Sequence, residues 1–386
     1  MPRINPENLR WARETAGLSL EEAAHGIGLT GASAIDRLAQ MESGAREPTR
    51  RQLVAMAKRY RRPLLALYLE APPANGERAP DFRTLRERDV GQEAALEALV
   101  RDTRVRQALL RGALEDEEEA EPLPLVGSVT IAQGAAAVAD IMERTLQFRI
   151  ADYRAARTVD DAFAILRQAV ERSGVFVLLI GNLGNYRSNI SPRVFRGFCI
   201  ANSVAPFIVI NETDSRAAWS FTLLHELAHV FLGQSAISGY GSENALERFC
   251  DDAASAFLLR PGEIDAFAFD AALPFDTMAD QIRDFASGLK VSRKMVAYNL
   301  LRAGRISNAL YRRLDERFDA DRLAAARQQG GGADYYIVRR HRIGRGLIRT
   351  VQRMVNSGAL TTSKAGRVLG VKPTAVDRLT AGINTA

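Results

Sequence analysis

Apolar positions in the first 70 residues recur every three to four residues, which is the spacing of short amphipathic helices. Ser19 followed by Glu22 is typical of a capping box and marks the start of one of them. A helix, a turn containing glycine and a second helix form the core of a helix-turn-helix, so we expect such a domain over residues 1–73. The predicted helices lie in "NLRWARETAG", "SLEEAAHGIG", "ASAIDRLAQMESG" and "TRRQLVAMAKRY".

A linker and a helical connector are predicted over residues 74–125. The stretch "APPANGERAPDF" is rich in Pro and Gly, as linkers often are. Residues 84–114 have helical periodicity with mixed charge, and the acidic run "EDEEEAEP" that follows is typical of a solvated loop.

The pattern in the centre of the chain changes from helical to strand-like and back. The runs "VFVLLI", "VFRGFCIA" and "PFIVIN" predict three short strands, at 175–180, 194–201 and 206–211. Helical patterns precede the strands, and others follow them at 217–232, 243–259, 278–287 and 292–304. This order predicts a mainly helical α+β domain with a small sheet, over residues 126–328.

The last 50 residues are helical and basic. The segment "TTSKAGRVLGVKPTAVDRLTAG" again has the spacing of a helix-turn-helix, with "LGVKP" as the turn. We predict a basic helical C-terminal domain over residues 329–386.

Composition places the chain among cytoplasmic globular proteins without a membrane segment. Hydrophobic residues make up 47% and charged residues 25%, which is ordinary for such proteins. No apolar stretch is long enough for a transmembrane helix, and the N-terminus lacks the apolar segment of a secretory signal. Two cysteines, Cys199 and Cys250, are too few for a disulfide framework.

The net charge of +6 is distributed unevenly. Residues 1–70 carry 11 Lys and Arg against 8 Asp and Glu, and residues 331–386 carry 10 against 2. Basic ends around an acidic centre are compatible with nucleic-acid contacts at the termini. A basic surface that is merely solvated is the alternative.

The segment "TLLHELAHVF" carries an H-E-x-x-H motif with the chain's only closely spaced histidines. Residues i and i+4 of a helix lie one above the other, so His225 and His229 can bind one cation. Glu226 lies beside them, in the position of a general base rather than a ligand. The alternative is a core helix with incidental polar residues, but burial of three such side chains without a metal is costly. We therefore expect a zincin-like metallopeptidase centre.

A catalytic zinc takes three protein ligands and keeps a fourth position open. The downstream segment "ENALERFCDD" offers Glu243, Glu247, Asp251 and Asp252. Glu247 and Asp251 share one helix face, so one can bind metal while the other orients a ligand histidine. We select Glu247 as the ligand and Asp251 as the orienting residue, with surface carboxylates as the alternative. Cys250 lies one position off this face and is expected in the core.

These residues carry a resemblance to a known family. The segments "RGFCIANSVAPFIVINETDSRAAWSFTLLHELAHVFLG" and "LERFCDDAASAFLLRP" resemble the ImmA/IrrE metallo-endopeptidases. The N-terminal "LRWARETAGLSLEEAA" and "ESGAREPTRRQLVAMAKRYRRPLLALYL" resemble the Xre/Cro-type helix-turn-helix that often precedes that peptidase. "ADYYIVRR" and "GALTTSKAGRVLGVK" are similar to later segments of the longer members.

The resemblance implies a function and a set of ligands. It implies zinc bound by His225, His229 and Glu247, and a protein substrate that is commonly a transcriptional repressor. Family members commonly have Asn where this chain has Asp251, which adds negative charge near the metal. The family also occurs in mobile elements and stress responses.

The N-terminal domain departs from the compact helix-turn-helix pattern, because the chain between Leu29 and Met41 is about four residues longer. If the predicted helix "ASAIDRLAQMESG" contacts DNA, Ser33, Arg37 and Gln40 are the candidate base-facing side chains. The alternative is that this domain binds a protein partner or dimerises.

The expected reaction is hydrolysis of a peptide bond. Glu226 would take a proton from the attacking water and deliver it to the leaving amine, while zinc would polarise the scissile carbonyl. "PFIVIN" would be an edge strand that holds an extended substrate, and Tyr240 is a candidate for contacting the oxyanion. The competing hypotheses are a DNA-binding regulator with an inactive peptidase centre and a toxin–antitoxin-like scaffold that acts by binding alone.

Overall fold

The computed structural model describes residues 4–72, 90–184, 188–238, 245–260, 262–326 and 334–381. The chain forms two compact units, each described below by itself. The first contains Met1–Asp102 and Asn182–Val194, and the second contains Thr103–Gly181 and Phe195–Ala386.

The first unit is built on a small helical bundle. The capping box expected at the start of the second helix is present: the Ser19 hydroxyl accepts from the Glu22 amide, and the Glu22 carboxylate accepts from the Ser19 amide. A buried ion pair between Arg13 and Glu42, 2.7 Å long, joins the first helix to the third. The elements are α1 (Pro6–Glu14), α2 (Leu20–Gly26), α3 (Ala34–Glu42), α4 (Arg50–Tyr60) and the 3₁₀ helix η1 (Leu64–Tyr68).

The second unit contains a four-stranded sheet. Its strands are β1 (Phe176–Leu179), β2 (Gly197–Ile200), β3 (Phe207–Ile210) and β4 (Ile237–Ser238), in the order β1-β3-β2-β4. β1 and β3 are parallel, whereas β2 is antiparallel to both β3 and β4. Helices both precede and follow the sheet, so the predicted α+β class is confirmed.

The prediction that "PFIVIN" forms an edge strand is wrong. β3 lies inside the sheet because it pairs with β1 on one side and with β2 on the other. Every position of β3 is buried, as is common for inner strands, and this burial accounts for the uninterrupted apolar sequence of the strand. Among the described strands, β1 and β4 form the edges.

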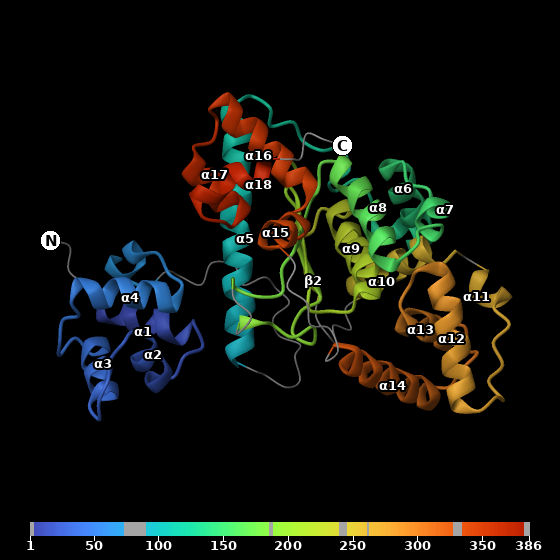
Figure 1. The fold of residues 1–386 in the computed structure, drawn as a ribbon, viewed down its shortest axis with the longest axis horizontal. Coiled ribbons are helices and arrows are strands. Elements are labelled where there is room, and N and C mark those ends of the chain that lie inside the picture. Colours follow the sequence, from blue (N-terminus) through green and yellow to red (C-terminus); the bar gives the residue numbers. More distant parts are fainter. Residues whose placement is uncertain are drawn as a thin grey trace. The chain divides into compact units, whose positions relative to one another are not determined.

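Helices of the second unit enclose a hydrophobic core beside this sheet. α9 (Arg216–Phe231) contacts β2 and β3, and it packs closely along α10 (Ala245–Leu258), as Figure 1 shows. The other helices before the C-terminal region are α5 (Val90–Asp116), which begins in the first unit, η2 (Ile131–Gln133), α6 (Ala135–Leu146), α7 (Ile150–Arg154), α8 (Val159–Arg172), α11 (Glu263–Ala266), α12 (Phe275–Leu289), α13 (Arg293–Arg302) and α14 (Asn308–Ala326).

The C-terminal helices belong to the same compact unit as the sheet. They are α15 (Tyr335–Ile343), α16 (Arg345–Ser357), α17 (Thr362–Leu369), η4 (Pro373–Ala375) and α18 (Val376–Thr380). α15 packs against β1, and α16 packs against both β1 and α8. The bounds of the four segments expected from the sequence, 1–73, 74–125, 126–328 and 329–386, stay predictions.

No helix among the described residues combines the length and apolar character that crossing a membrane requires.

Candidate metal centre

The helix that carries the H-E-x-x-H motif is held on all sides by the core. The turn before it is fixed by Asn211, whose side-chain amide donates to the Phe195 carbonyl and whose oxygen accepts from the Thr213 amide. Leu224, just before the motif, and Leu227, within it, are fully buried. The helix ends before Gly233, at φ +70°, where a Cβ would lie only 3.1 Å from Gly127 Cα. These contacts fix the direction in which the two histidines point.

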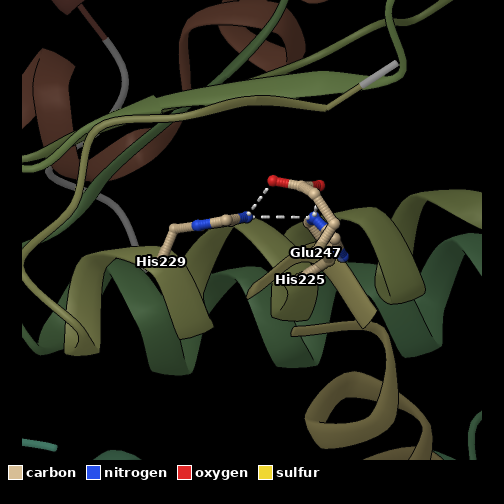
Figure 2. Close-up of side chains that lie close together, drawn as sticks. All are labelled: His225, His229 and Glu247. Carbon is tan, nitrogen blue, oxygen red and sulfur yellow. Dashed lines mark hydrogen bonds and ion pairs between the residues drawn. The ribbon is translucent and has the colours of Figure 1, made fainter. Parts of the chain in front are cut away.

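Three buried side chains converge on one point between α9 and α10 (Figure 2). His225 Nε2 lies 3.2 Å from one oxygen of Glu247, and His229 Nε2 lies 3.2 Å from the other. The two Nε2 atoms are themselves 3.2 Å apart. None of the three residues is more than 5% exposed.

This triangle is slightly smaller than, but close to, one face of a tetrahedral zinc site. Donor atoms bound to one zinc at about 2.0–2.2 Å lie roughly 3.3–3.6 Å from one another. Two imidazole nitrogens and a carboxylate aimed at each other repel unless a cation or proton lies between them. The donor set of two nitrogens and one oxygen fits zinc and leaves a fourth position for water or substrate.

Asp251 contacts the outer nitrogen of His225. Its Oδ1 lies 2.8 Å from His225 Nδ1, so a proton on Nδ1 is donated to the carboxylate and the Nε2 lone pair points inward. Burial acts to lower the pKa of His225, but hydrogen bonds to Asp251 and Glu247 outweigh it and raise the pKa to about 10. Burial likewise acts to raise the pKa of Glu247, but hydrogen bonds from His225 and His229 lower it to about 2. The site therefore favours positive charge at its centre.

Glu226 is fully buried and lies against strand β2. A Cβ on Gly197 would lie 2.8 Å from Glu226 Oε1 and 2.7 Å from Thr222 Cγ2. The strand can pass this close only because residue 197 has no side chain. Gly197 was not among the residues selected from the sequence, although a glycine inside a strand is a signal of close backbone approach.

The other candidates near the motif have different placements. Tyr240 and Glu243 lie outside the described residues. Asp252 forms an ion pair with Arg302 of α13 instead of facing the histidines. Burial raises the pKa of the Cys250 thiol, as expected for a core cysteine, and the described metal-binding group does not include it.

The candidate DNA-contacting residues lie at the start of α3 and along it. Ser33 is the exposed N-cap residue, and Gln40 is also exposed. The Arg37 guanidinium donates to the carbonyls of Thr30 and Ser33, so it is partly engaged within its own loop.

Comparison with known families supports the resemblance for one segment. A peptidase-family model described as the IrrE N-terminal-like domain matches residues 187–301. The metal-centre segment is similar to a peptidase domain. The match includes β2, β3, α9 and α10 but neither terminal region. No curated protein and no solved structure gives a significant match to the chain.

Proposed function

We propose that this protein is a zinc-dependent endopeptidase that cleaves a protein partner. The triangle formed by His225, His229 and Glu247 is the observation that carries the proposal. The family match supports a peptidase, and the donor set supports zinc as the metal.

In this proposal the three side chains hold the metal and Asp251 positions one of them. Zinc bound there would polarise a scissile carbonyl and bring the pKa of a bound water toward neutrality. Asp251 fixes the ring orientation of His225 and makes Nε2 a stronger donor to the metal.

Glu226 is the proposed general base. It follows His225 directly on α9 and is not among the three residues of the ligand triangle, which supports the role that glutamate has in the H-E-x-x-H arrangement. Its carboxylate takes a proton from water and delivers it to the leaving amine. Burial beneath β2 keeps this group fixed in one place.

The substrate chain is proposed to add to the sheet at β4 rather than β3. β4 is the described edge strand next to β2, the strand that lies against Glu226. An extended peptide that pairs with such an edge gains main-chain hydrogen bonds and offers its scissile bond to the site.

We further propose that the cleaved partner is a transcriptional repressor or antitoxin-like regulator in the cytoplasm. The support is the resemblance of the N-terminal bundle to a helix-turn-helix, which would bind DNA or the partner itself. The alternative, a DNA-binding regulator with an inactive peptidase-like centre, predicts DNA binding without proteolysis.

Metal analysis of three purified proteins tests the proposal. We expect about one zinc per chain in the wild type, loss of zinc in Glu247→Ala, and retained zinc in Glu226→Gln. Each protein is then incubated with purified regulators encoded beside this gene, and fragments are sought by mass spectrometry. Only the wild type should cleave. Zinc-free wild-type protein, or cleavage by Glu226→Gln, would contradict the assignment.

A further inference from the structure

The last described helices have the arrangement of a helix-turn-helix. α16, α17 and α18 all contact one another, and Figure 1 shows them packed together. α17 is followed by a short turn at Gly370–Lys372 and then by the continuous segment made of η4 and α18. Three helices with a short turn between the second and third are the core of helix-turn-helix domains.

Two glycines make this turn sterically feasible. Gly370 has φ +68°, a conformation that glycine adopts without strain. Gly366, in the middle of α17, lies where a Cβ would be 3.0 Å from the Val371 carbonyl oxygen and 3.1 Å from Pro373 N. A larger residue at position 366 would clash with the backbone of the turn and of η4. The close approach of α17 to this segment therefore requires glycine at position 366.

The two helices bury one face and expose the other. Ala365, Leu369, Val376 and Leu379 form the buried face. The exposed face carries basic and hydroxyl side chains from both helices and the turn: Thr362, Ser363, Lys364, Arg367, Lys372, Thr374 and Arg378. Asp377 is the exposed acid within these helices.

Much of the positive charge of the C-terminal region is used inside the protein, but Lys364 and Lys372 form no ion pair with another described residue. Arg340 donates to carbonyls at the end of α18, and Arg342 pairs with Glu212. Arg353 pairs with Glu119. By contrast, Lys364 and Lys372 are exposed at the start of α17 and just before η4, where a helix-turn-helix meets DNA.

From this placement we infer that the α17–α18 face binds the phosphate backbone of duplex DNA. Lysine and arginine neutralise phosphates, and hydroxyl groups donate hydrogen bonds to them. The geometry of a short helix preceded by a turn suits a groove of duplex DNA rather than a single strand. This inference is independent of the proposed peptidase activity and of the N-terminal bundle.

The test is a binding titration of the full-length protein against a fluorescent random-sequence DNA duplex at several salt concentrations. The variant carries Lys364→Glu with Lys372→Glu. A matched control carries Arg149→Glu with Arg157→Glu. These two arginines lie just before and just after α7 in the same unit, and their side chains are 75% and 91% exposed. Both double variants change the net charge equally, so a difference between them reports position and not total charge.

We expect the wild type and the control to bind the duplex alike and the Lys364/Lys372 variant to bind at least about tenfold more weakly at ~50 mM salt. Loss of two phosphate contacts should also reduce the slope of log affinity against log salt by about 2. Circular dichroism and zinc content should match those of the wild type, because both lysines are exposed and far in sequence from the metal ligands.

Four outcomes would overturn the inference. They are failure of the wild type to bind the duplex at low salt, equal binding by the Lys364/Lys372 variant, and equal weakening in the control. The fourth is tighter binding to single-stranded RNA than to the duplex. If Arg37→Glu abolishes binding while the lysine variant retains it, the contact belongs to the N-terminal bundle instead.

Discussion

Gly197 shows how a single missing side chain can determine the position of a proposed catalytic group. The carboxylate of Glu226 and the methyl group of Thr222 occupy the space where a Cβ at residue 197 would lie. The side chains of Thr222 and Glu226 cannot move away easily, because both residues are in the buried part of α9. A methyl group at this position therefore has to displace Glu226, β2 or both.

We predict that Gly197→Ala lowers kcat by about 10- to 100-fold, with zinc content and KM nearly unchanged. The reason is that a displacement of roughly 1 Å at a reacting group can cost about 100-fold in rate. Gly288→Ala is the matched control, because a Cβ there meets nothing within 4 Å. Steady-state kinetics on the identified substrate give the measurement, and an unchanged kcat would exclude a positioning role for Gly197.

Asp251 allows a second prediction at this scale. Asp251→Ala removes the acceptor for His225 Nδ1 and should weaken zinc affinity by about 10- to 100-fold, as loss of such outer partners typically does. Asp251→Asn keeps an acceptor oxygen and should weaken it less. Competition with a chromogenic chelator measures both affinities.

The neighbouring Asp252→Ala is the control for this series, since Asp252 pairs with Arg302 and not with the histidines. If Asp252→Ala weakened zinc binding as much as Asp251→Ala, the effect would come from general charge or helix stability and not from orientation of His225.

At the scale of elements, the junction between α8 and the C-terminal helices depends on a buried ion pair. Arg167 and Glu171 have side chains only 8% and 7% exposed, and their closest atoms are 3.0 Å apart. Arg167 also donates to the carbonyls of Val177 and His341, while Glu171 accepts from the Gly346 amide. One pair thus connects α8, β1, α15 and α16.

Arg167→Met should reduce the free energy of unfolding by about 3–5 kcal/mol, because it leaves the Glu171 carboxylate buried without its cation. The double variant Arg167→Met with Glu171→Met should lose less than the sum of the single changes. Arg172→Met, at an exposed position of the same helix, should change stability by no more than about 0.5 kcal/mol. Denaturant unfolding of the wild type, both single variants, the double variant and Arg172→Met decides; strict additivity would show that the pair does not act as a unit.

The difference between local and long-range structure explains what the sequence could predict. Helix geometry fixes which residues share a face, so the spacing of His225 and His229 predicted two donors that the structure brings together. The spacing within α10 likewise predicted that Glu247 and Asp251 share a helix face, and in the structure Glu247 contacts both histidines while Asp251 contacts the outer nitrogen of His225. Their roles as ligand and orienting residue stay proposals.

The strand order could not be obtained in this way. The apolar run at 206–211 fits an inner strand or an edge strand equally, and its pairing with both β1 and β2 depends on residues far away in the chain. The importance of Gly197 was hidden for the same reason, because it arises only when β2 crosses α9.

At the scale of the whole molecule, His341 links stability to pH. Burial, together with the positive charges of Arg167 and Arg216, lowers the pKa of His341 in the folded protein. The unfolded chain, with a histidine pKa near ~6.5, therefore binds the proton more readily. Stability associated with His341 is present above this pH and is lost as the pH falls below it.

His341→Gln should remove this part of the acid sensitivity. Between pH 7.5 and pH 5.5 we expect Tm of the wild type to fall further than Tm of the variant, because glutamine takes up no proton. Thermal unfolding at both pH values provides the comparison. His25→Gln serves as the control, since His25 is an exposed residue of the first unit. A variant that loses as much stability on acidification as the wild type would rule out this contribution.

Zinc should also stabilise the molecule as a whole, because the proposed ligands join α9 to α10 inside the main hydrophobic core of the second unit. A ligand that binds only the folded state adds about 4.1 kcal/mol when its free concentration is ~1,000 times Kd. Chelation with EDTA should therefore lower Tm of the wild type and of Glu226→Gln, which keeps all three ligands. Glu247→Ala should start from a lower Tm and show no further change with EDTA. Equal EDTA shifts in Glu247→Ala and the wild type would mean that the stabilising metal binds elsewhere, since the response would then be independent of the carboxylate that completes the triangle.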